Sequence, residues 1–299
     1  MPKILNYGSL NLDFVYDVEH FVTAGETETS TNLTVNCGGK GLNQSIAAAK
    51  AGAKTYHAGK VGNDGSILKE LLAENKVDVS HITESDTKSG HAIIQLNTSG
   101  QNCILLFPGS NHTVSEEEID SCLSCFEKGD FLILQNEINN IPYLMKKAYE
   151  KGMFIIFNPS PITPEIIDYP IEKVSLLVLN EVEGKALSGK DEPDDILYSL
   201  HQKYPDCKIL LSLGKSGAVY FDKSDKIEHG IYRVKVVDTT AAGDTLTGYF
   251  AACLANGETP QKALELASIA SSISVSRAGA AKSIPTLEEV KNCNLEYMK

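Results

Sequence analysis

The segment DTTAAGD, residues 238–244, places three small residues directly before an acidic one. The residues that follow, TLTGYFAACLANG, repeat apolar side chains at helical spacing, so we predict that a helix begins at Asp244. Free N–H groups and the macrodipole at a helix start favour an anion, and small side chains let it approach. The segment is therefore suited to hold a phosphoryl group while Asp244 takes a proton from an attacking hydroxyl. The alternative is that Asp244 serves only as a capping or first-turn acid.

A second segment suited to chemistry is NCGGKGLNQSIAAAKAG, residues 36–52, in which a Gly-Gly-Lys-Gly turn at 38–41 precedes a helical pattern. The turn has neither the spacing of a Walker A loop nor that of a GxGxxG dinucleotide fingerprint. Glycines let the backbone approach a small ligand closely, and Lys40 and Asn43 can then point their polar ends at hydroxyl groups. The alternative is an ordinary tight turn.

Short apolar runs alternate with helical patterns along the chain, which predicts βαβ units and a mainly parallel sheet covered by helices. The runs are KILNYGS, FLILQNE, MFIIFNPSP, VSLLVLNEVE and ILLSLGKSG. Each ends in polar or small residues, and open α/β sheets bind ligands beyond the carboxyl ends of their strands. We therefore expect these ends to line one crevice, with ordinary polar loops as the alternative. The ends are Asn6, Ser9, Gln135, Glu137, Asn158, Ser160, Asn180, Glu183, Ser212 and Gly214.

Two segments, from about 11–36 and 90–108, break this rhythm and alternate polar and apolar residues with period two. LNLDFVYDV, TETSTNLTVN, HAIIQLN and NCILLF read as four strands of a small second sheet inserted into the main domain. A sheet with one face over a ligand and an apolar opposite face is a lid or a dimer surface. We therefore treat residues 1–299 as a single α/β domain with an inserted lid.

Composition limits the classes of function. A chain of 299 residues that is 42% hydrophobic can bury a full core. A net charge of −12 without a basic stripe argues against nucleic-acid binding. The absence of a secretory signal and of an apolar run of about 18 residues predicts no membrane segment and a cytoplasmic location. Seven scattered cysteines fit reduced thiols. The CxxC at Cys122 and Cys125 is interpreted as structural, with metal binding or redox chemistry as the alternative.

The motifs GGKGLNQ, NEVE, SLGKSG and DTTAAGD, in this order, resemble those of the ribokinase (PfkB) family of sugar kinases. The resemblance covers essentially the whole chain. It implies a three-layer, ribokinase-like α/β fold, in which helices flank a mainly parallel central sheet and a small β-sheet forms a lid. It also implies ATP as the phosphoryl donor, Mg2+, K+ as an activating ion, and a homodimer formed through the lid.

The resemblance assigns a role to individual residues. Asp244 corresponds to the catalytic base, and Ala241, Ala242 and Gly243 correspond to its anion hole. The implied sugar-binding residues are Asn11, Asp13, Gly39, Lys40, Asn43 and Glu137. Those implied beside the nucleotide are Asn180, Glu183, Ser212, Gly214, Gly217 and Ser268, with Glu183 acting on Mg2+ through water. Those implied for the potassium site, several through backbone carbonyls, are Asp238, Thr240, Ser274, Arg277, Gly279 and Ser283.

Carboxylates and amides suit the hydroxyls of a free polyol, whereas a sugar phosphate would ask for more cationic residues. We therefore predict a kinase for a free sugar, with D-ribose, converted to D-ribose 5-phosphate, as the first choice. His91 and the segment FPGSN, residues 107–111, depart from the usual pattern near the lid. Specificity for 2-deoxyribose, another pentose, a ketohexose or a nucleoside therefore stays open. We interpret His91 as a lid or rim residue rather than a ligand.

Two rivals belong to other classes. A non-catalytic, sugar-binding regulator would need neither a base nor a phosphoryl cradle, so the presence of Asp244 and Glu183 argues against it. A dehydrogenase that uses NAD is disfavoured because its glycine fingerprint is missing.

Overall fold

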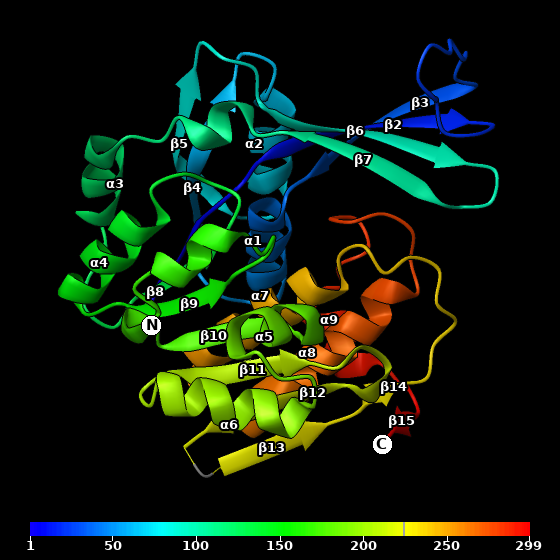
Figure 1. Ribbon diagram of the computed structural model, residues 1–299. Helices are drawn as coiled ribbons and strands as arrows, with labels where there is room; N and C mark the ends of the chain where they lie inside the picture. Colours follow the sequence, from blue (N-terminus) through cyan, green and yellow to red (C-terminus); the bar gives the residue numbers. More distant parts are fainter. Residues whose placement is uncertain (224) are drawn as a thin grey trace.

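The structure is a computed structural model that describes residues 1–223 and 225–299 (Figure 1). Within these residues the strands form a nine-stranded, a four-stranded and a two-stranded sheet. The strands are β1 (Ile4–Tyr7), β2 (Asn11–Val18), β3 (Asn32–Gly38), β4 (Thr55–Gly62), β5 (Asp78–Ser85), β6 (Gly90–Asn97), β7 (Asn102–Phe107), β8 (Phe131–Gln135), β9 (Phe154–Asn158), β10 (Leu176–Asn180), β11 (Lys208–Ser212), β12 (Ala218–Asp222), β13 (Asp225–His229), β14 (Ile231–Tyr232) and β15 (Tyr297–Met298).

The largest sheet has the order β13-β12-β11-β10-β9-β8-β1-β4-β5. Strands β11 to β5 in this order pair in parallel, and β12 and β13 add antiparallel pairs at one edge. The predicted, mainly parallel sheet is thus confirmed. The five apolar runs named above form β1, β8, β9, β10 and β11, which are neighbours in the sheet. Their carboxyl ends therefore lie along one edge.

Helices cover both faces of this sheet, giving three layers (Figure 1). One core lies under α1, α2, α7, α8 and α9, and a second core lies under α3, α4, α5 and α6. Ile4 belongs to the first core and its neighbour Leu5 to the second, because successive strand residues point to opposite faces. The helices are α1 (Lys40–Lys50), α2 (Ser66–Glu74), α3 (Glu116–Leu123), α4 (Ile141–Lys151), α5 (Glu181–Ser188), α6 (Pro193–Lys203), α7 (Ala242–Ala255), α8 (Pro260–Val275) and α9 (Leu287–Asn292).

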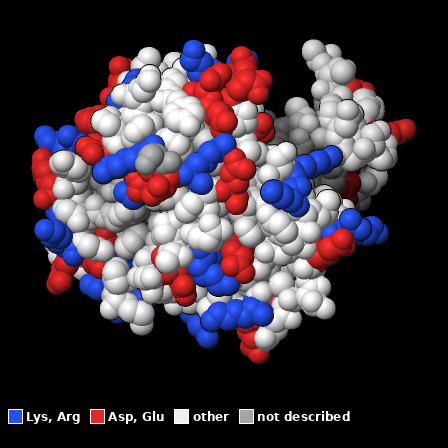
Figure 2. All heavy atoms as spheres, turned by 90° about the horizontal axis from the view of Figure 1, so that it is seen from below, with Lys and Arg blue, Asp and Glu red and all other residues white. Residues whose placement is uncertain are grey.

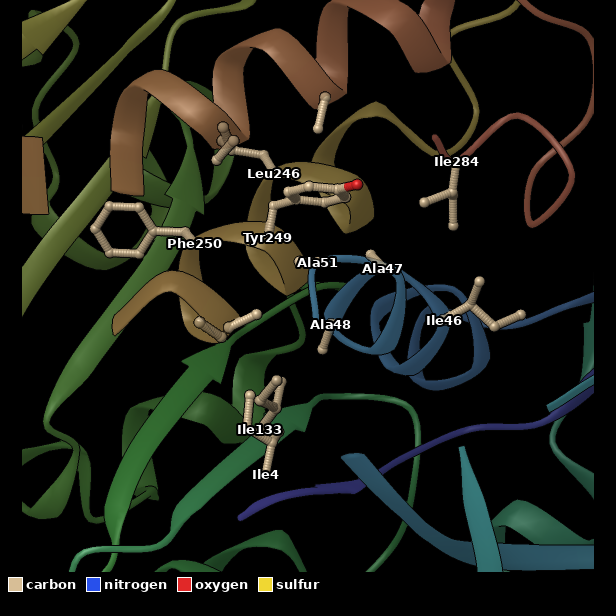
Figure 3. Packing of buried hydrophobic residues seen from close by; sticks show 14 of the residues in the cluster. Ile4, Ile46, Ala47, Ala48, Ala51, Ile133, Leu246, Tyr249, Phe250 and Ile284 are labelled. Carbon is tan, nitrogen blue, oxygen red and sulfur yellow. The ribbon is translucent and has the colours of Figure 1, made fainter. Parts of the chain in front are cut away.

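The first core depends on a close crossing of α1 and α7 (Figure 3). A Cβ atom on Gly248 would lie 2.5 Å from the Cβ of Ala47 and 2.6 Å from the carbonyl oxygen of Gln44, so a larger residue would force the helices apart. The next residue, Tyr249, is fully buried, and its hydroxyl donates to the carbonyl of Pro285 at 2.7 Å. This crossing fixes the first turn of α7 against α1.

The predicted start of α7 needs a correction. The helix begins at Ala242, with Ala241 at the N-cap, rather than at Asp244. The amide of Ala242 donates to the carbonyl of Thr239 at 3.2 Å, so a turn already closes ahead of the acidic residue. Asp244 is therefore the third residue of the helix, inside the first turn that carries the positive end of the macrodipole.

The second sheet, with the order β3-β2-β6-β7, extends away from the body of the molecule and forms the lid (Figure 1). All four predicted lid strands are present, although β3 starts only at Asn32, after the first residues of TETSTNLTVN. Phe14, Ile93 and Leu105 are directly paired across β2, β6 and β7 and so share one face. We call this the outer face, because the opposite residues, which include Val15 and Ile94, line a cleft beneath the lid.

Charged side chains of both signs are intermixed on the surface seen in Figure 2. Among the helices in the described parts of the chain, none combines the length and the apolar character needed to cross a membrane. Cys122 packs into the second core, where burial raises its pKa to about 12, whereas Cys125 is exposed. This difference fits a structural use of the CxxC segment.

Candidate active site

A cavity of about 210 Å³, here the central cavity, lies at the carboxyl ends of β9, β10 and β11 and beside the start of α7. Five of the predicted strand-end residues line it: Asn158, Ser160, Asn180, Glu183 and Ser212. Lys40, Thr240, Gly243, Asp244 and Thr247 also line it. The strand ends Asn6, Ser9, Gln135 and Glu137 instead make hydrogen bonds to residues at the start of α1.

Asp244 lines this cavity although its residue exposure is only 7%. Its two carboxylate oxygens accept hydrogen bonds from Nδ2 of Asn43, at 3.0 Å, and from Nε2 of Gln44, at 2.9 Å. Burial raises the pKa of Asp244, whereas the charge of Lys40 and the two amide donors oppose this rise. The carboxylate is thus held in one orientation by α1.

The backbone at Gly243, directly before Asp244, faces open space on the side of the two cavities. A Cβ atom added to Gly243 would meet nothing within 4 Å, and Gly243 lines both the central cavity and a second cavity of about 140 Å³. In the described part of the chain, the amides of Ala241, Gly243 and Asp244 have no protein acceptor, whereas that of Ala242 is engaged by Thr239. The candidate anion site therefore offers the amides on either side of Ala242 rather than the complete predicted set.

The Gly-Gly-Lys-Gly turn is fixed to the end of β1 through Ser9. Gly39 has φ of 98°, and a Cβ there would lie 3.0 Å from the carbonyl oxygen of Ser9, so this position requires glycine. The amide of Gly41 donates to Oγ of Ser9 at 3.2 Å. Glu137 accepts from Oγ of Ser9 and, at 3.0 Å, from the amide of Lys40. The turn and Glu137 are therefore a single hydrogen-bonded unit.

Lys40 is the cation that balances the acidic groups of the site. Burial lowers its pKa, but the carboxylates of Asp244, Glu137 and Glu183 outweigh this effect, so the pKa of Lys40 is raised. Burial also raises the pKa of Glu137, against the opposing charge of Lys40. One ammonium group thus faces three carboxylates, and the site has spare capacity to accept hydrogen bonds from hydroxyl groups.

Asn11 and Asp13 belong to the first lid strand and lie in different surroundings. Oδ1 of Asn11 accepts from Nδ2 of Asn111 at 2.7 Å, and Oδ1 of Asn111 accepts from the amide of Leu10 at 3.0 Å. Asp13 lines the lid cleft, a space of about 760 Å³ between the lid, α2 and residues 278–282. Burial, aided by the charge of Glu137, raises the pKa of Asp13 to about 6.

The second cavity is the candidate nucleotide side. Four of the six residues predicted beside the nucleotide line it: Ser212, Gly214, Gly217 and Ser268. Asn180 and Glu183 form a capping box at the start of α5: the Asn180 side chain accepts from the amide of Glu183 at 2.9 Å, and the Glu183 carboxylate accepts from the amide of Asn180 at 3.0 Å. The NxxE pattern thus has a structural use that also holds Glu183 rigidly at the cavity wall.

The residues predicted for potassium form two groups. Asp238 accepts from the amide of Thr240 at 2.9 Å and from the amide of Gly279 at 3.0 Å, and all three residues line the lid cleft. Ser274 and Ser283 are buried, with their Oγ atoms 2.7 Å apart. The Arg277 side chain instead pairs with Glu289 at 2.7 Å. Carboxylate, hydroxyl and carbonyl oxygens are the ligands that a hard cation requires.

Two buried residues of the site, Gln44 and Asn111, were not named as site residues by the sequence analysis, and a third, Gln135, was named only as a polar strand end. Gln44 lies inside the quoted motif GGKGLNQ and Gln135 among the polar strand ends, whereas Asn111 lies in the FPGSN segment that departs from the usual pattern. A buried amide next to a candidate ligand residue is the signal that could have found them, because such a group requires a partner.

Comparison with known proteins places the chain in a family. The family model described as "pfkB family carbohydrate kinase" matches residues 1–287. The chain is 32% identical over 303 residues to the ribokinase of Haemophilus influenzae, with 98% of this chain and 97% of the relative covered. Among solved structures, the ribokinase of Cryptococcus neoformans in complex with ADP has a TM-score of 0.87 and 30% identity, covering 97% of this chain and 99% of that chain. The ribokinase of Arabidopsis thaliana complexed with ribose and ATP has a TM-score of 0.86 and 27% identity, covering 97% of both chains.

Asp13→Asn should stabilise the protein at neutral pH and have little effect near pH 4. The pKa of Asp13 in the folded state, about 6, lies above its ordinary 3.8, so the unfolded chain ionises first as the pH rises. The folded state loses stability between these two values, and the variant avoids that loss of about 1–3 kcal/mol. Urea unfolding of both proteins from about pH 4 to about pH 8 measures the difference.

The control is Asn36→Ala, which changes the residue paired with Asp13 in β3 without removing a titratable group. Its effect on the free energy of unfolding should be the same throughout the pH range. An equally constant effect of Asp13→Asn would contradict the raised pKa.

Proposed function

We propose that this chain, which belongs to the PfkB family of carbohydrate kinases, transfers the γ-phosphoryl group of ATP to D-ribose and releases D-ribose 5-phosphate and ADP. The observation that carries the proposal is the position of Asp244, a buried carboxylate that lines the central cavity next to the unpaired amide of Gly243. The similarity to ribokinases over the whole chain, including one solved with ribose and ATP, supports the choice of ribose.

In the proposed reaction Asp244 accepts the proton of the sugar hydroxyl as the hydroxyl oxygen bonds to the γ-phosphorus. The bond from that phosphorus to the bridging oxygen breaks, and ADP leaves. Because the transition state of phosphoryl transfer is usually loose, late proton removal by an ordinary carboxylate is sufficient. The amides of Gly243 and Asp244, at the positive end of α7, stabilise the negative charge on the transferred phosphoryl group by donating hydrogen bonds to its oxygens.

The remaining polar residues of the two cavities hold the donor. The second cavity, with its glycines and serines, is assigned to the nucleotide, and Asn180 and Glu183, which line the central cavity, are assigned to its phosphates. Mg2+ is typically bound by one or two carboxylates, substrate phosphates and retained waters, which suits an ion near Glu183. Within the described residues no group of three or more His, Cys, Asp or Glu side chains could hold a metal by itself. The ion would neutralise the phosphate charge.

The sugar is assigned to the space between Asp244, the glycine turn and Asp13. Asn43 donates to Asp244 through Nδ2, and its Oδ1 is buried with no partner among the described residues, so this oxygen is free to accept from a hydroxyl. Among the described residues that line the central cavity, Lys40 is the only cationic one. Many acceptors and one cation favour a neutral polyol over a sugar phosphate.

The two departures near the lid do not supply a sugar contact. His91 packs on the outer face of the lid, where its ring centroid is 5.1 Å from that of Phe107 and 5.9 Å from that of Phe14. The FPGSN segment contributes Asn111, which holds Asn11 rather than lining the lid cleft. These positions therefore influence the shape of the lid. The competing substrates to test are 2-deoxyribose, other pentoses, ketohexoses and nucleosides.

We assign a potassium site to the two loops that Asp238 joins, those of Thr240 and Gly279, and we infer that the bound ion stabilises the anion site. Thr240 lines both the lid cleft and the central cavity, and Ala241 follows it at the N-cap of α7. A cation bound by Asp238 and neighbouring carbonyl oxygens would hold this turn without touching the sugar.

We also assign the outer face of the lid to a second copy of the chain. Ile93, Leu105 and Phe107 are 38%, 68% and 49% exposed on this face, and together with Phe14 they form an apolar surface. Such a surface marks an interaction site, and the same face on a second copy can pack against it around a two-fold axis.

An ADP-release assay over free sugars and nucleosides tests the activity and its base. Ribose should give the highest kcat/KM in the panel of ribose, 2-deoxyribose, fructose and adenosine. Asp244→Asn should lower kcat by about 10²- to 10⁴-fold while ribose still binds, because the variant loses only the proton acceptor. Asp120→Asn, which changes an exposed carboxylate on α3, should match the parent. Ribose binding without ADP release from the parent would instead favour the sugar-binding regulator.

Replacing potassium by tetramethylammonium at equal ionic strength should lower the activity of the parent by about 5- to 100-fold, the usual range for coupling between two sites. Asp238→Asn should be insensitive to the exchange, because the variant lacks the carboxylate that joins the two loops. Glu288→Gln, an exposed change on α9, should keep the full response. Equal activity of the parent in both salts would remove the potassium assignment.

Leu105→Lys should convert a dimer into a monomer, because a charge would be buried in the middle of an apolar interface. Light scattering coupled to gel filtration measures the mass of both proteins. Ile167→Lys is the matched control, since Ile167 is 74% exposed but lies at residues 164–168, outside the lid. A monomeric parent would contradict the assigned interface.

A further inference from the structure

We infer that Gln44 is the positioning residue of the proposed base, and that it acts as the last member of a relay of buried amides that begins at a backbone carbonyl. The relay consists of Asn6, Gln135 and Gln44, from β1, β8 and α1. The inference deepens the proposed function and rests on it in one respect, the role of Asp244 as base.

The contacts of the relay are short and continuous. Nδ2 of Asn6 donates to the carbonyl of Gly41 at 2.9 Å. Nε2 of Gln135 donates to Oδ1 of Asn6 at 3.0 Å and to Oε1 of Gln44 at 2.8 Å. Nε2 of Gln44 then donates to Oδ1 of Asp244 at 2.9 Å. The relay therefore connects the end of two central strands to the proposed base.

The hydrogen bonds at the two ends of the relay set its direction, although Oε1 of Gln135 is then buried without a partner in the described part of the chain. A backbone carbonyl can only accept, so the Asn6 amide must present its NH₂ group to Gly41 and its oxygen to Gln135. Gln135 must then present its NH₂ group to both neighbours, which leaves the oxygen of Gln44 facing Gln135 and its NH₂ group facing the carboxylate. A reversed Gln44 would place two oxygens together at Asp244 and two NH₂ groups together at Gln135. The orientation of the donor is thus set from the backbone.

Both polar groups of Gln44 are occupied by protein partners. Gln44 is fully buried, its oxygen accepts from Gln135 and its NH₂ group donates to Asp244, whereas Oδ1 of Asn43, the other donor to Asp244, has no partner among the described residues. The two neighbours on α1 therefore have different roles. Gln44 orients the carboxylate, whereas Asn43 also has an oxygen that can accept from the sugar. It also supplies one of the two neutral donors that oppose the effect of burial on the base.

The other charged groups near Asp244 are known from the structure. Lys40 on α1 favours the ionised carboxylate, and the charge of Asp244 in turn raises the pKa of Glu137 after β8. Neither side chain contacts Gln44 by a hydrogen bond in the part of the chain that the structure describes. Replacing Gln44 therefore removes one donor to Asp244 and leaves the charges around it in place.

The test is the titration of Asp244 in ¹³C-aspartate-labelled protein, recorded without sugar, nucleotide, Mg2+ or K+. The carboxyl resonance that is missing from Asp244→Asn identifies the residue. Gln44→Met keeps the length of the side chain but removes its donor, so the midpoint should rise by about one to two pH units. Gln44→Glu, which places a second acid beside Oδ1, should raise it further.

Two further variants make the result specific. Gln135→Met leaves Gln44 in place but removes the donor that fixes its orientation, so the midpoint should rise by a smaller amount, and this holds as a test if Gln44→Met does not fold. Ser45→Ala is the matched control, because Ser45 is the next residue on α1, is equally buried, and contacts His57 at 2.7 Å instead of the base. It should lower the thermal midpoint and leave the titration of Asp244 unchanged.

The pH profile of kcat/KM separates the inference from the proposed function. If both hold, the acidic limb moves upward in Gln44→Met by the same amount as the titration midpoint. An unchanged midpoint in Gln44→Met and Gln135→Met overturns the inference. A shifted midpoint with an unshifted activity profile upholds the contact and contradicts the role of Asp244 as base.

Discussion

The crossing of α1 and α7 is the constraint on which the rest of the site depends. Gly248 allows the two helix backbones to approach, with no room for a Cβ between them. Only at this separation do the side chains of Asn43 and Gln44 reach both oxygens of Asp244. The same crossing places the glycine turn that starts α1 beside the free amides that start α7. Two helix N-termini from distant parts of the sequence therefore meet at one cavity. The first amides of α1 are engaged by Glu137 and Ser9, so the free amides of α7 are the ones that favour an anionic ligand.

The electrostatics of the site follow from this arrangement. Asp244, Glu137 and Asp13 all have raised pKa values, chiefly because burial disfavours their charged forms. Lys40 is the cation that offsets part of this cost. An acceptor-rich site with a single ammonium group is satisfied by a ligand that brings hydroxyl donors and by a cation that accompanies phosphates. Buried titratable groups with shifted pKa values and few compensating partners are typical of binding sites.

Much of the fold could be predicted from sequence because its signals are local. The apolar runs that form β1 and β8 to β11, and the period-two segments of the lid, carry their structure in five to ten adjacent residues. The exact helix start could not be read in this way, since the amide of Ala242 turns back to Thr239. Gln44 and Asn111 escaped assignment for a different reason. Their partners, Asp244 and Leu10, are 200 and 101 residues away, and only strand order and helix crossing bring them together.

The anchoring of the lid and of the glycine turn to the same short segment is a further consequence of chain order. Ser9 holds the turn through Gly41, and the next residue, Leu10, is held by Asn111. The first lid strand then starts at Asn11, whose side chain also contacts Asn111. Any movement of the lid would therefore pull on residues 9–11 at its base, and Ser9 in this segment is hydrogen-bonded to Glu137, which also holds the glycine turn. Because hydrogen-bonded and closely packed groups deform little, the lid is expected to move beyond this base, along β2 and β6, while the base itself keeps the ligand groups in register.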